Sequence, residues 1–268
     1  MQSAELQKLD TYYKKRYLSA FSLVVAFVAL LAASSSFVDF DPVQSLLNLP
    51  GGFVWLADNF MPTERSFQYL PKILGALGAT FLDAVAASVV AALLSFVLAV
   101  IGSRVVGFGG IVQIIVRGIA TVLRNIPTVA WAFILLFTFR QSEITGWIVL
   151  FLKSFGFLTR TFLENIEESA QGPLEAAVSC GATRLQMIAH VIIPNNLPMM
   201  VSWVLYQMET NIRDATLVGM LTGTGIGFVF QLYYCSFRYD TAGLVILCIM
   251  VVAILCEAVS NYVRRRVM

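Results

Sequence analysis

Long apolar stretches alternate along this chain with short polar segments. A helix needs roughly 20 mainly apolar residues to cross the hydrocarbon core of a bilayer. Six windows meet or approach that length: 17–37, 73–103, 112–139, 146–157, 197–221 and 242–263. The third window is broken near Pro127, and the fourth is short enough to need flanking residues from 142 to 159. The pattern predicts an all-α, polytopic membrane protein with about six transmembrane helices.

Short side chains recur at every fourth position of the second window, at Asp83, Ala87, Ala91, Ser95, Ala99 and Ser103. Residues four apart lie on one face of a helix, and small residues let two helix backbones approach closely. We therefore expect a tight helix–helix contact along this stripe, within one subunit or across a dimer. The alternative is an alanine-rich helix with no special face.

Composition agrees with lipid as the main solvent, because 58% of the 268 residues are hydrophobic and 13% are charged. The net charge of +2 is too small to indicate a nucleic-acid partner. The four cysteines form no Cys-x-x-Cys pair and His190 is the single histidine, so neither a metal site nor a disulfide framework is expected. No lysine follows a glycine, which excludes a Gly-Lys-Ser/Thr phosphate loop, and no catalytic Ser-His-Asp set is present. We predict a non-catalytic subunit that binds no cofactor itself.

Basic residues set the expected orientation, because cytoplasmic loops carry an excess of lysine and arginine. With the N-terminus in the cytoplasm, that side receives Lys14, Lys15, Arg16, Arg104, Arg160, Arg184, Arg264, Arg265 and Arg266. Both termini and the loop near 160–196 are thus predicted to be cytoplasmic. We divide the chain into two parts. Residues 1–72 contain the N-terminal tail, the first transmembrane helix and an aromatic-rich outer loop at the membrane interface. Residues 73–268 form the core that carries the cytoplasmic loop.

The first half of that loop has the residues of a short helix. Gly172-Pro173 places a proline at a first helical position, and Glu175 falls in the first turn, where the helix dipole favours an acid. Gly181 is suited to end the helix. We expect a glycine bend at this point.

A second short helix is expected directly afterwards. Thr183 and Gln186 have the spacing of a capping box, which marks a helix start. The helix that they open is predicted to end near Pro194. The loop is therefore predicted to be two short helices joined at a rigid bend.

The fifth window contains ionisable residues that lipid does not tolerate, at a cost of roughly 3 kcal/mol for a charge at the bilayer centre. Glu209 and Arg213 are four apart with the acid first, the favourable order for a helical ion pair. The pair either locks the helix or contacts a substrate, and Asp214 remains for a neighbouring helix or chain. These side chains must face protein or water.

Glycines follow at 219, 223, 225 and 227, and we expect them to interrupt the helix. Irregular backbone at membrane depth is tolerated where it is buried in protein or lines a cavity, so a gate, a re-entrant turn or a plain outer turn fits. Pro127 is expected to kink the third window and free carbonyls near Arg124, which is either an interfacial anchor or part of a pathway.

The cytoplasmic loop resembles the EAA loop of ABC-importer permeases. The resemblance rests on Glu175, Ala176, Ala177, Gly181 and Pro194, with aliphatic residues at 191 and 193. Residues 209–219, the glycine-rich segment 223–227 and Arg124-Asn125-Ile126-Pro127 are similar to permeases of phosphonate importers. The similarity runs from about residue 74 to the C-terminus.

This resemblance implies a type I importer permease fold (MetI-like) in a bacterial inner membrane. It implies two ABC ATPase subunits that bind ATP and Mg, a second permease copy or paralogue, and an extracytoplasmic substrate-binding protein. The ATPases would dock at Glu175, Ala176, Ala177, Gly181 and Pro194, and a phosphonate- or phosphite-type anion would cross the membrane. Pathway or gate residues would be Arg124, Asn125, Glu209, Asn211, Arg213, Asp214, Thr216, Gly223 and Gly225.

Three other functions stay open. A methionine or polar amino-acid ABC permease shares the arginine-proline and glycine-rich elements. An ATP-independent secondary transporter would be expected to show an internal repeat and needs no docking loop, and we find no convincing repeat. A membrane scaffold or sensor would not transport at all.

Overall fold

The computed structural model describes residues 2–38, 40–169 and 171–267. It divides into two units, one up to Asp58 and one from Asn59 onward. The first unit contains α1 (Gln2–Phe37) and most of α2 (Pro42–Phe60). Asp41 begins α2, because its Oδ1 accepts the backbone N–H groups of Val43 and Gln44 at 2.9 and 3.1 Å. The aromatic-rich outer loop is thus partly helical, which the sequence analysis did not predict.

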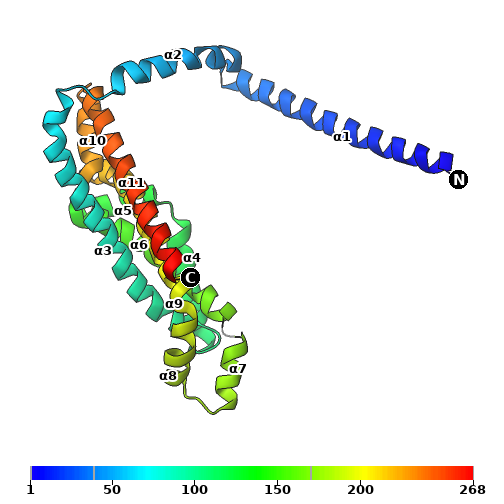
Figure 1. Cartoon of the computed structure of the whole chain (residues 1–268), viewed down its shortest axis with the longest axis vertical. Coiled ribbons are helices and arrows are strands. Elements are labelled where there is room, and N and C mark those ends of the chain that lie inside the picture. Colours follow the sequence, from blue (N-terminus) through cyan, green and yellow to red (C-terminus); the bar gives the residue numbers. More distant parts are fainter. Residues whose placement is uncertain (1, 39, 170, 268) are drawn as a thin grey trace. The chain divides into compact units, whose positions relative to one another are not determined.

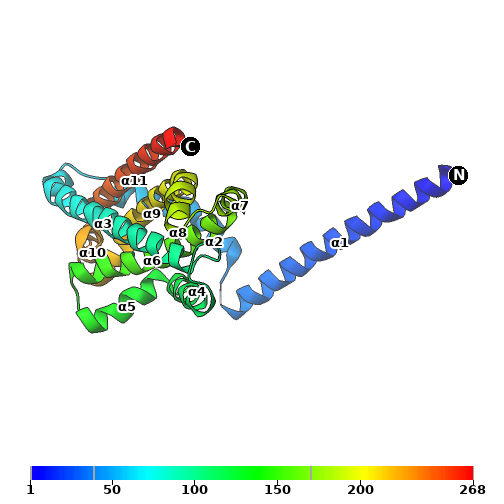
Figure 2. The same cartoon turned by 90° about the horizontal axis from the view of Figure 1, so that it is seen from below.

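The second unit contains the remaining helices. They are η1 (Ser66–Tyr69), α3 (Leu70–Gly102), α4 (Gly110–Asn125), α5 (Thr128–Phe139), α6 (Glu143–Ser169), α7 (Gln171–Ser179), α8 (Arg184–Met187), the π-helical turn η2 (Ile188–Ile192), α9 (Ile193–Thr222), α10 (Gly225–Cys235) and α11 (Tyr239–Val267). Figure 1 shows α7 and α8 together at one end of this unit and α10 toward the other end. Figure 2 views the unit from the α7–α8 side.

Within the described ranges, five helices are long and apolar enough to cross a membrane, and a bent pair, α4 and α5, raises the number to six if it is one span. The pair bends by 95°. Ile126 adopts an extended conformation, and the following Pro127 disfavours the helical one. The ring N–H of Trp131 donates to the Leu123 carbonyl at 3.4 Å, so one carbonyl freed by the break has a partner. The all-α, multi-span prediction is confirmed, and the short fourth window lies in a complete 27-residue helix, α6.

The centre of the second unit is α6, which contacts α3, α4, α5 and α9. The predicted stripe on α3 packs against it: Ala87, Ala91, Ser95, Ala99 and Ser103 are all fully buried. The Ser95 hydroxyl donates to the Phe155 carbonyl at 3.1 Å and lies 3.0 Å from the Thr159 hydroxyl, which donates to it. The tight contact is therefore made within the subunit, between α3 and α6.

Candidate functional site

One buried leucine fixes α7 to the bundle. Leu174 is 8% exposed and belongs to a cluster with Val106, Ile166 of α6 and Met187 of α8. Glu175 and Ala176 beside it are exposed. Leu174, with Ala177 packed against the same cluster, therefore orients α7 and leaves its other face open.

The end of α7 is a complete glycine cap. Gly181 has φ +76°, and its N–H donates to the Val178 carbonyl at 2.9 Å, while the N–H of Ala182 donates to the Ala177 carbonyl at 3.0 Å. These two bonds make a Schellman motif, in which a left-handed residue closes the last turn. The predicted glycine bend is confirmed. Glu175 is not in the first turn as expected, because α7 begins at Gln171 and so makes Glu175 its fifth residue.

The second short helix starts as predicted and ends differently. Thr183 and Gln186 form the capping box, with the Thr183 N–H donating to Gln186 Oε1 at 2.8 Å. The expected stop near Pro194 is wrong, because α8 runs through η2 into α9. The Ile193 N–H donates to the Ile188 carbonyl, five residues back, and Pro194 then falls in the first turn of α9. This wide π-type turn directly precedes Pro194, and the helix continues past the proline.

Residues 171–187, which we call the α7–α8 corner, present apolar side chains to the outside. Val178 is 58% exposed and Leu185 is 78% exposed, and Ala176 and Cys180 are exposed with them. Glu175 adds a charge to this surface. An exposed apolar surface rimmed by polar residues is typical of a protein-binding site.

The predicted ion pair on α9 is present. Arg213 Nη1 donates to Glu209 Oε1 at 2.8 Å, with side chains 49% and 11% exposed, respectively. The acid is thus almost enclosed, and the arginine reaches outward from the same helix. Whether the pair locks α9 or also meets a substrate stays a prediction.

Asp214 has a partner that the sequence analysis missed. Lys153 of α6 forms an ion pair with Asp214, and both side chains are mostly buried. A lone lysine within the apolar window 146–157 was the available signal, since a charge at membrane depth needs a partner. The pair links α6 to α9.

Asn211 lies in the core between three helices. It is fully buried, and its amide nitrogen lies 2.9 Å from Ser88 Oγ of α3 and 2.6 Å from Ser154 Oγ of α6. Gln207, also buried, donates to Ser154 Oγ and to Asn211 Oδ1, both at 3.1 Å. This amide network supplies hydrogen-bond partners to buried polar groups in a region where lipid and apolar side chains supply no such partners. It fixes the register of α9 against α3 and α6.

The glycines predicted to interrupt the helix divide into two kinds. Gly223, with φ +69°, ends α9, and Gly225, with φ +59°, begins α10. Gly219 and Gly227 instead lie inside helices, where a Cβ on Gly227 would come 2.0 Å from the Thr216 carbonyl oxygen. Their lack of a side chain lets α9 and α10 touch. The hydroxyl of Thr216 is buried and has no hydrogen-bond partner among the residues that the structure describes.

This turn is also attached to α3. The N–H of Ile226 donates to the Thr80 hydroxyl at 2.9 Å, and a Cβ on Gly225 would lie 2.4 Å from that hydroxyl. With 11 residues, α10 is about 16 Å long, roughly half of the hydrocarbon thickness. A gate or a re-entrant turn is compatible with this geometry.

Arg124 and Asn125 form the end of α4 at the Pro127 break. Both are exposed, and the Asn125 amide donates to the Thr121 carbonyl at 2.9 Å. Their part in a pathway stays a prediction. Across the described part of the chain, no group of three or more His, Cys, Asp or Glu side chains could hold a metal ion.

Comparison with known proteins places these features in a family. Residues 93–268, more than half of the chain, match the model of the binding-protein-dependent transport system inner membrane component. The phosphite transport system permease protein PtxC of Stutzerimonas stutzeri is 27% identical over 221 residues, which cover 82% of this chain and 80% of that protein. The phosphate-import permease protein PhnE of Mycolicibacterium smegmatis is 27% identical over 145 residues, which cover 54% of this chain and 27% of that protein.

Solved structures show the same fold. The MetNI methionine ABC transporter in an inward-facing conformation has a chain with TM-score 0.65 and 19% identity, and the match covers 77% of this chain and 99% of that one. The sequence-based expectation of a type I importer permease fold is confirmed. The chain is a multi-pass membrane protein that belongs to the family of binding-protein-dependent transport system inner membrane components.

Proposed function

We propose that this chain is the membrane-spanning permease of an importer that separate ATPase subunits drive through the α7–α8 corner. The observation that carries the proposal is the construction of the corner. Leu174 and the Gly181 cap hold it rigidly, while Val178 and Leu185 stay exposed at one end of the bundle (Figure 1). A rigid surface with open apolar side chains is suited to receive a partner and to transmit its movement.

The partners follow from the family. Two ATPase subunits would bind ATP and Mg and dock on two corners, one in each of two permease copies, and an external binding protein would deliver the substrate. The family description, a component of a binding-protein-dependent system, supports that delivery. The corner would then face the cytoplasm of a bacterial cell, as would both termini. This chain would hold no cofactor itself.

The substrate class that we propose is a phosphorus oxyanion such as phosphite or a phosphonate. Relatives named for phosphite transport and phosphate import support it. Two ion pairs also supply cations: Lys153 pairs with Asp214 between α6 and α9, Arg213 pairs with Glu209 within α9, and half of the Arg213 side chain is exposed. Guanidinium groups bind oxyanions through paired N–H donors, so Arg213 is the residue of choice for this contact.

Uptake by the reconstituted complex tests the proposal. Proteoliposomes are prepared with this chain in the membrane, its ATPase and ATP inside the vesicles, and its binding protein outside. They should accumulate labelled phosphite or a phosphonate from the outer solution. Methionine and taurine, at equal concentration, should neither be accumulated nor compete. Uptake that persists without ATP would support a secondary transporter, and preferential methionine uptake would support an amino-acid permease. Either result would contradict the proposal.

A further inference from the structure

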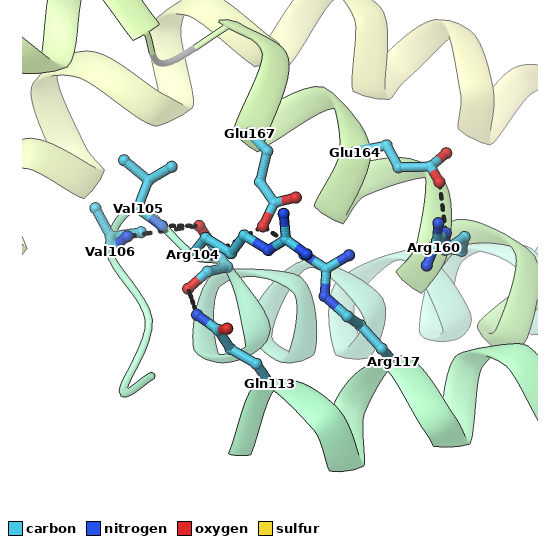
Figure 3. Close-up of polar contacts among 9 residues, drawn as sticks. Arg104, Val105, Val106, Gln113, Arg117, Arg160, Glu164 and Glu167 are labelled. Carbon is cyan, nitrogen blue, oxygen red and sulfur yellow. Dashed lines mark hydrogen bonds and ion pairs between the residues drawn. The ribbon is translucent and has the colours of Figure 1, made fainter. Parts of the chain in front are cut away.

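One carboxylate ties the end of α6 to two other segments. Glu167 Oε1 accepts the backbone N–H of Arg104, in the turn after α3, at 2.9 Å. The same oxygen accepts Arg117 Nη2, from α4, at 2.6 Å. Figure 3 shows Glu167 between the Arg104 turn and Arg117. The side chains of Glu167 and Arg117 are each 20% exposed, so solvent screens the pair only partly.

The turn that Glu167 holds is itself rigid. The Ser103 hydroxyl accepts the N–H groups of Val105 and Val106 at 3.1 and 3.5 Å. The Ser103 carbonyl accepts the Gly107 N–H at 3.0 Å and the Gln113 amide of α4 at 3.3 Å. A force on Glu167 therefore reaches a turn that has little freedom to absorb it.

The α7–α8 corner begins directly after this link. Glu167 lies in the last turn of α6, and α7 starts at Gln171. Leu174 of α7 packs in the same apolar cluster as Val106 of the turn and Val116 of α4. The corner, the turn and α4 thus meet in one apolar cluster, and the end of α6 just before the corner adds an ionic contact to the turn and α4.

A second contact joins α4 to α6 at the other end of α4. Gly156 of α6 lies so close to α4 that a Cβ there would be 2.6 Å from Leu123 Cβ and 2.9 Å from the Arg124 nitrogen. Because α6 holds α4 at Glu167 and at Gly156, α4 must follow α6 when α6 moves. The Pro127 break then separates this rigid pair from α5.

We propose that Glu167 and Arg117 are positioning residues that transmit movement of the α7–α8 corner to α4 during the transport cycle. This inference rests on the proposed function, because it assumes that an ATPase moves the corner. Neither residue needs to touch the substrate. Their role is to make α4 respond to the ATPase together with α6.

The chain contains a matched control. Arg160 and Glu164 form an ion pair four residues apart on α6, one turn before Glu167, with more exposed side chains. That pair lies within one helix (Figure 3), and among the described residues it joins α6 to no other segment. Glu164→Gln removes the same charge from the same helix without cutting the link to α4.

Hydrogen exchange in the assembled complex tests the inference, with and without a non-hydrolysable ATP analogue. In the wild type, the analogue should change exchange in both 171–187 and 104–119. In Glu167→Gln and in Arg117→Gln, the response of 171–187 should remain and that of 104–119 should fall at least about threefold. The Arg104 amide should exchange about tenfold faster in Glu167→Gln, because it loses a charged acceptor. Glu164→Gln should behave as the wild type.

The double variant Glu167→Gln with Arg117→Gln should be no worse than the more affected single one, since both changes cut one link. The inference is overturned if 104–119 still responds to the analogue in Glu167→Gln, or if Glu164→Gln loses the response equally. A wild-type chain that binds no ATPase would overturn the proposed function, and this inference with it. That outcome differs from a failure of this inference alone, because the wild-type chain would form no complex with the ATPase before any hydrogen exchange is measured.

Discussion

The same substitution, glycine to alanine, should have opposite effects at two helical positions, one packed against a neighbouring helix and one exposed. At Gly156 of α6, the new Cβ would lie 2.6 Å from Leu123 Cβ and 2.9 to 3.0 Å from backbone atoms of Leu123 and Arg124. Ordinary contacts begin near 3.4 Å, so α4 must shift by roughly 0.8 Å. At Gly118 of α4, no described atom beyond the backbone of its own helix and its chain neighbours lies within 4 Å of the new Cβ.

The magnitudes follow from these two environments. Overpacking against backbone costs about 1 to 3 kcal/mol, because the neighbour cannot rotate out of the way. At the open position, alanine lowers the conformational entropy of the unfolded chain and should stabilise by about 0.5 to 1 kcal/mol. Gly156→Ala is thus expected to lower the thermal unfolding midpoint and Gly118→Ala to raise it.

The assay is thermal unfolding of the purified chain in one detergent, followed by circular dichroism at matched protein concentration. The hydrogen-exchange rate of the backbone amides of residues 110–125 should also rise in Gly156→Ala, since the shifted helix loses contacts to α6. An unchanged midpoint and unchanged exchange in Gly156→Ala would refute the close packing of α4 on α6.

Three further substitutions test the site. Asn211→Leu removes the hydrogen bonds to Ser88 and Ser154 and should lower the free energy of unfolding by about 1 to 3 kcal/mol, measured by thermal unfolding. The control Asn125→Leu, at an exposed position, should change stability little, and equal effects of the two substitutions would contradict the buried network. Gly181→Val should lower the free energy of unfolding by about 1 to 2 kcal/mol, because a β-branched residue disfavours φ +76°. It should also weaken ATPase binding in a pull-down, and an undiminished complex would argue against the rigid bend. Arg213→Gln should lower uptake at matched assembly; full rescue by adding Glu209→Gln would show that Arg213 only neutralises its partner.

Much of the fold could be predicted from the sequence, because lipid requires long apolar helices and the small-residue stripe on α3 is periodic. The stripe predicted a close contact, and Ser95 and Ala99 are buried against α6. The glycine bend was predictable for a local reason, since a left-handed residue at Gly181 closes α7 through its own neighbours.

Features that depend on distant parts of the chain could not be predicted in this way. The expected end near Pro194 failed because the wide turn before it is compatible with a proline, and tertiary packing carries the helix onward into α9. The partner of Asp214 could not be chosen from its own helix, because Lys153 is on α6. The donors to Glu167 could not be predicted either, because Arg104 lies 63 residues and Arg117 lies 50 residues before it in the sequence.

Binding of the ATPase to the α7–α8 corner is the central claim, and Leu185→Asp tests it most directly. Leu185 is 78% exposed and lies in the first turn of α8, where the helix dipole favours an acid, so the change should not unfold the corner. Phe237, 79% exposed in the turn between α10 and α11, supplies the control Phe237→Asp. We expect Leu185→Asp to lower ATPase co-purification and ATP-driven uptake at least about tenfold and Phe237→Asp to retain ATPase co-purification. Equal ATPase binding by Leu185→Asp and the wild type would contradict the claim.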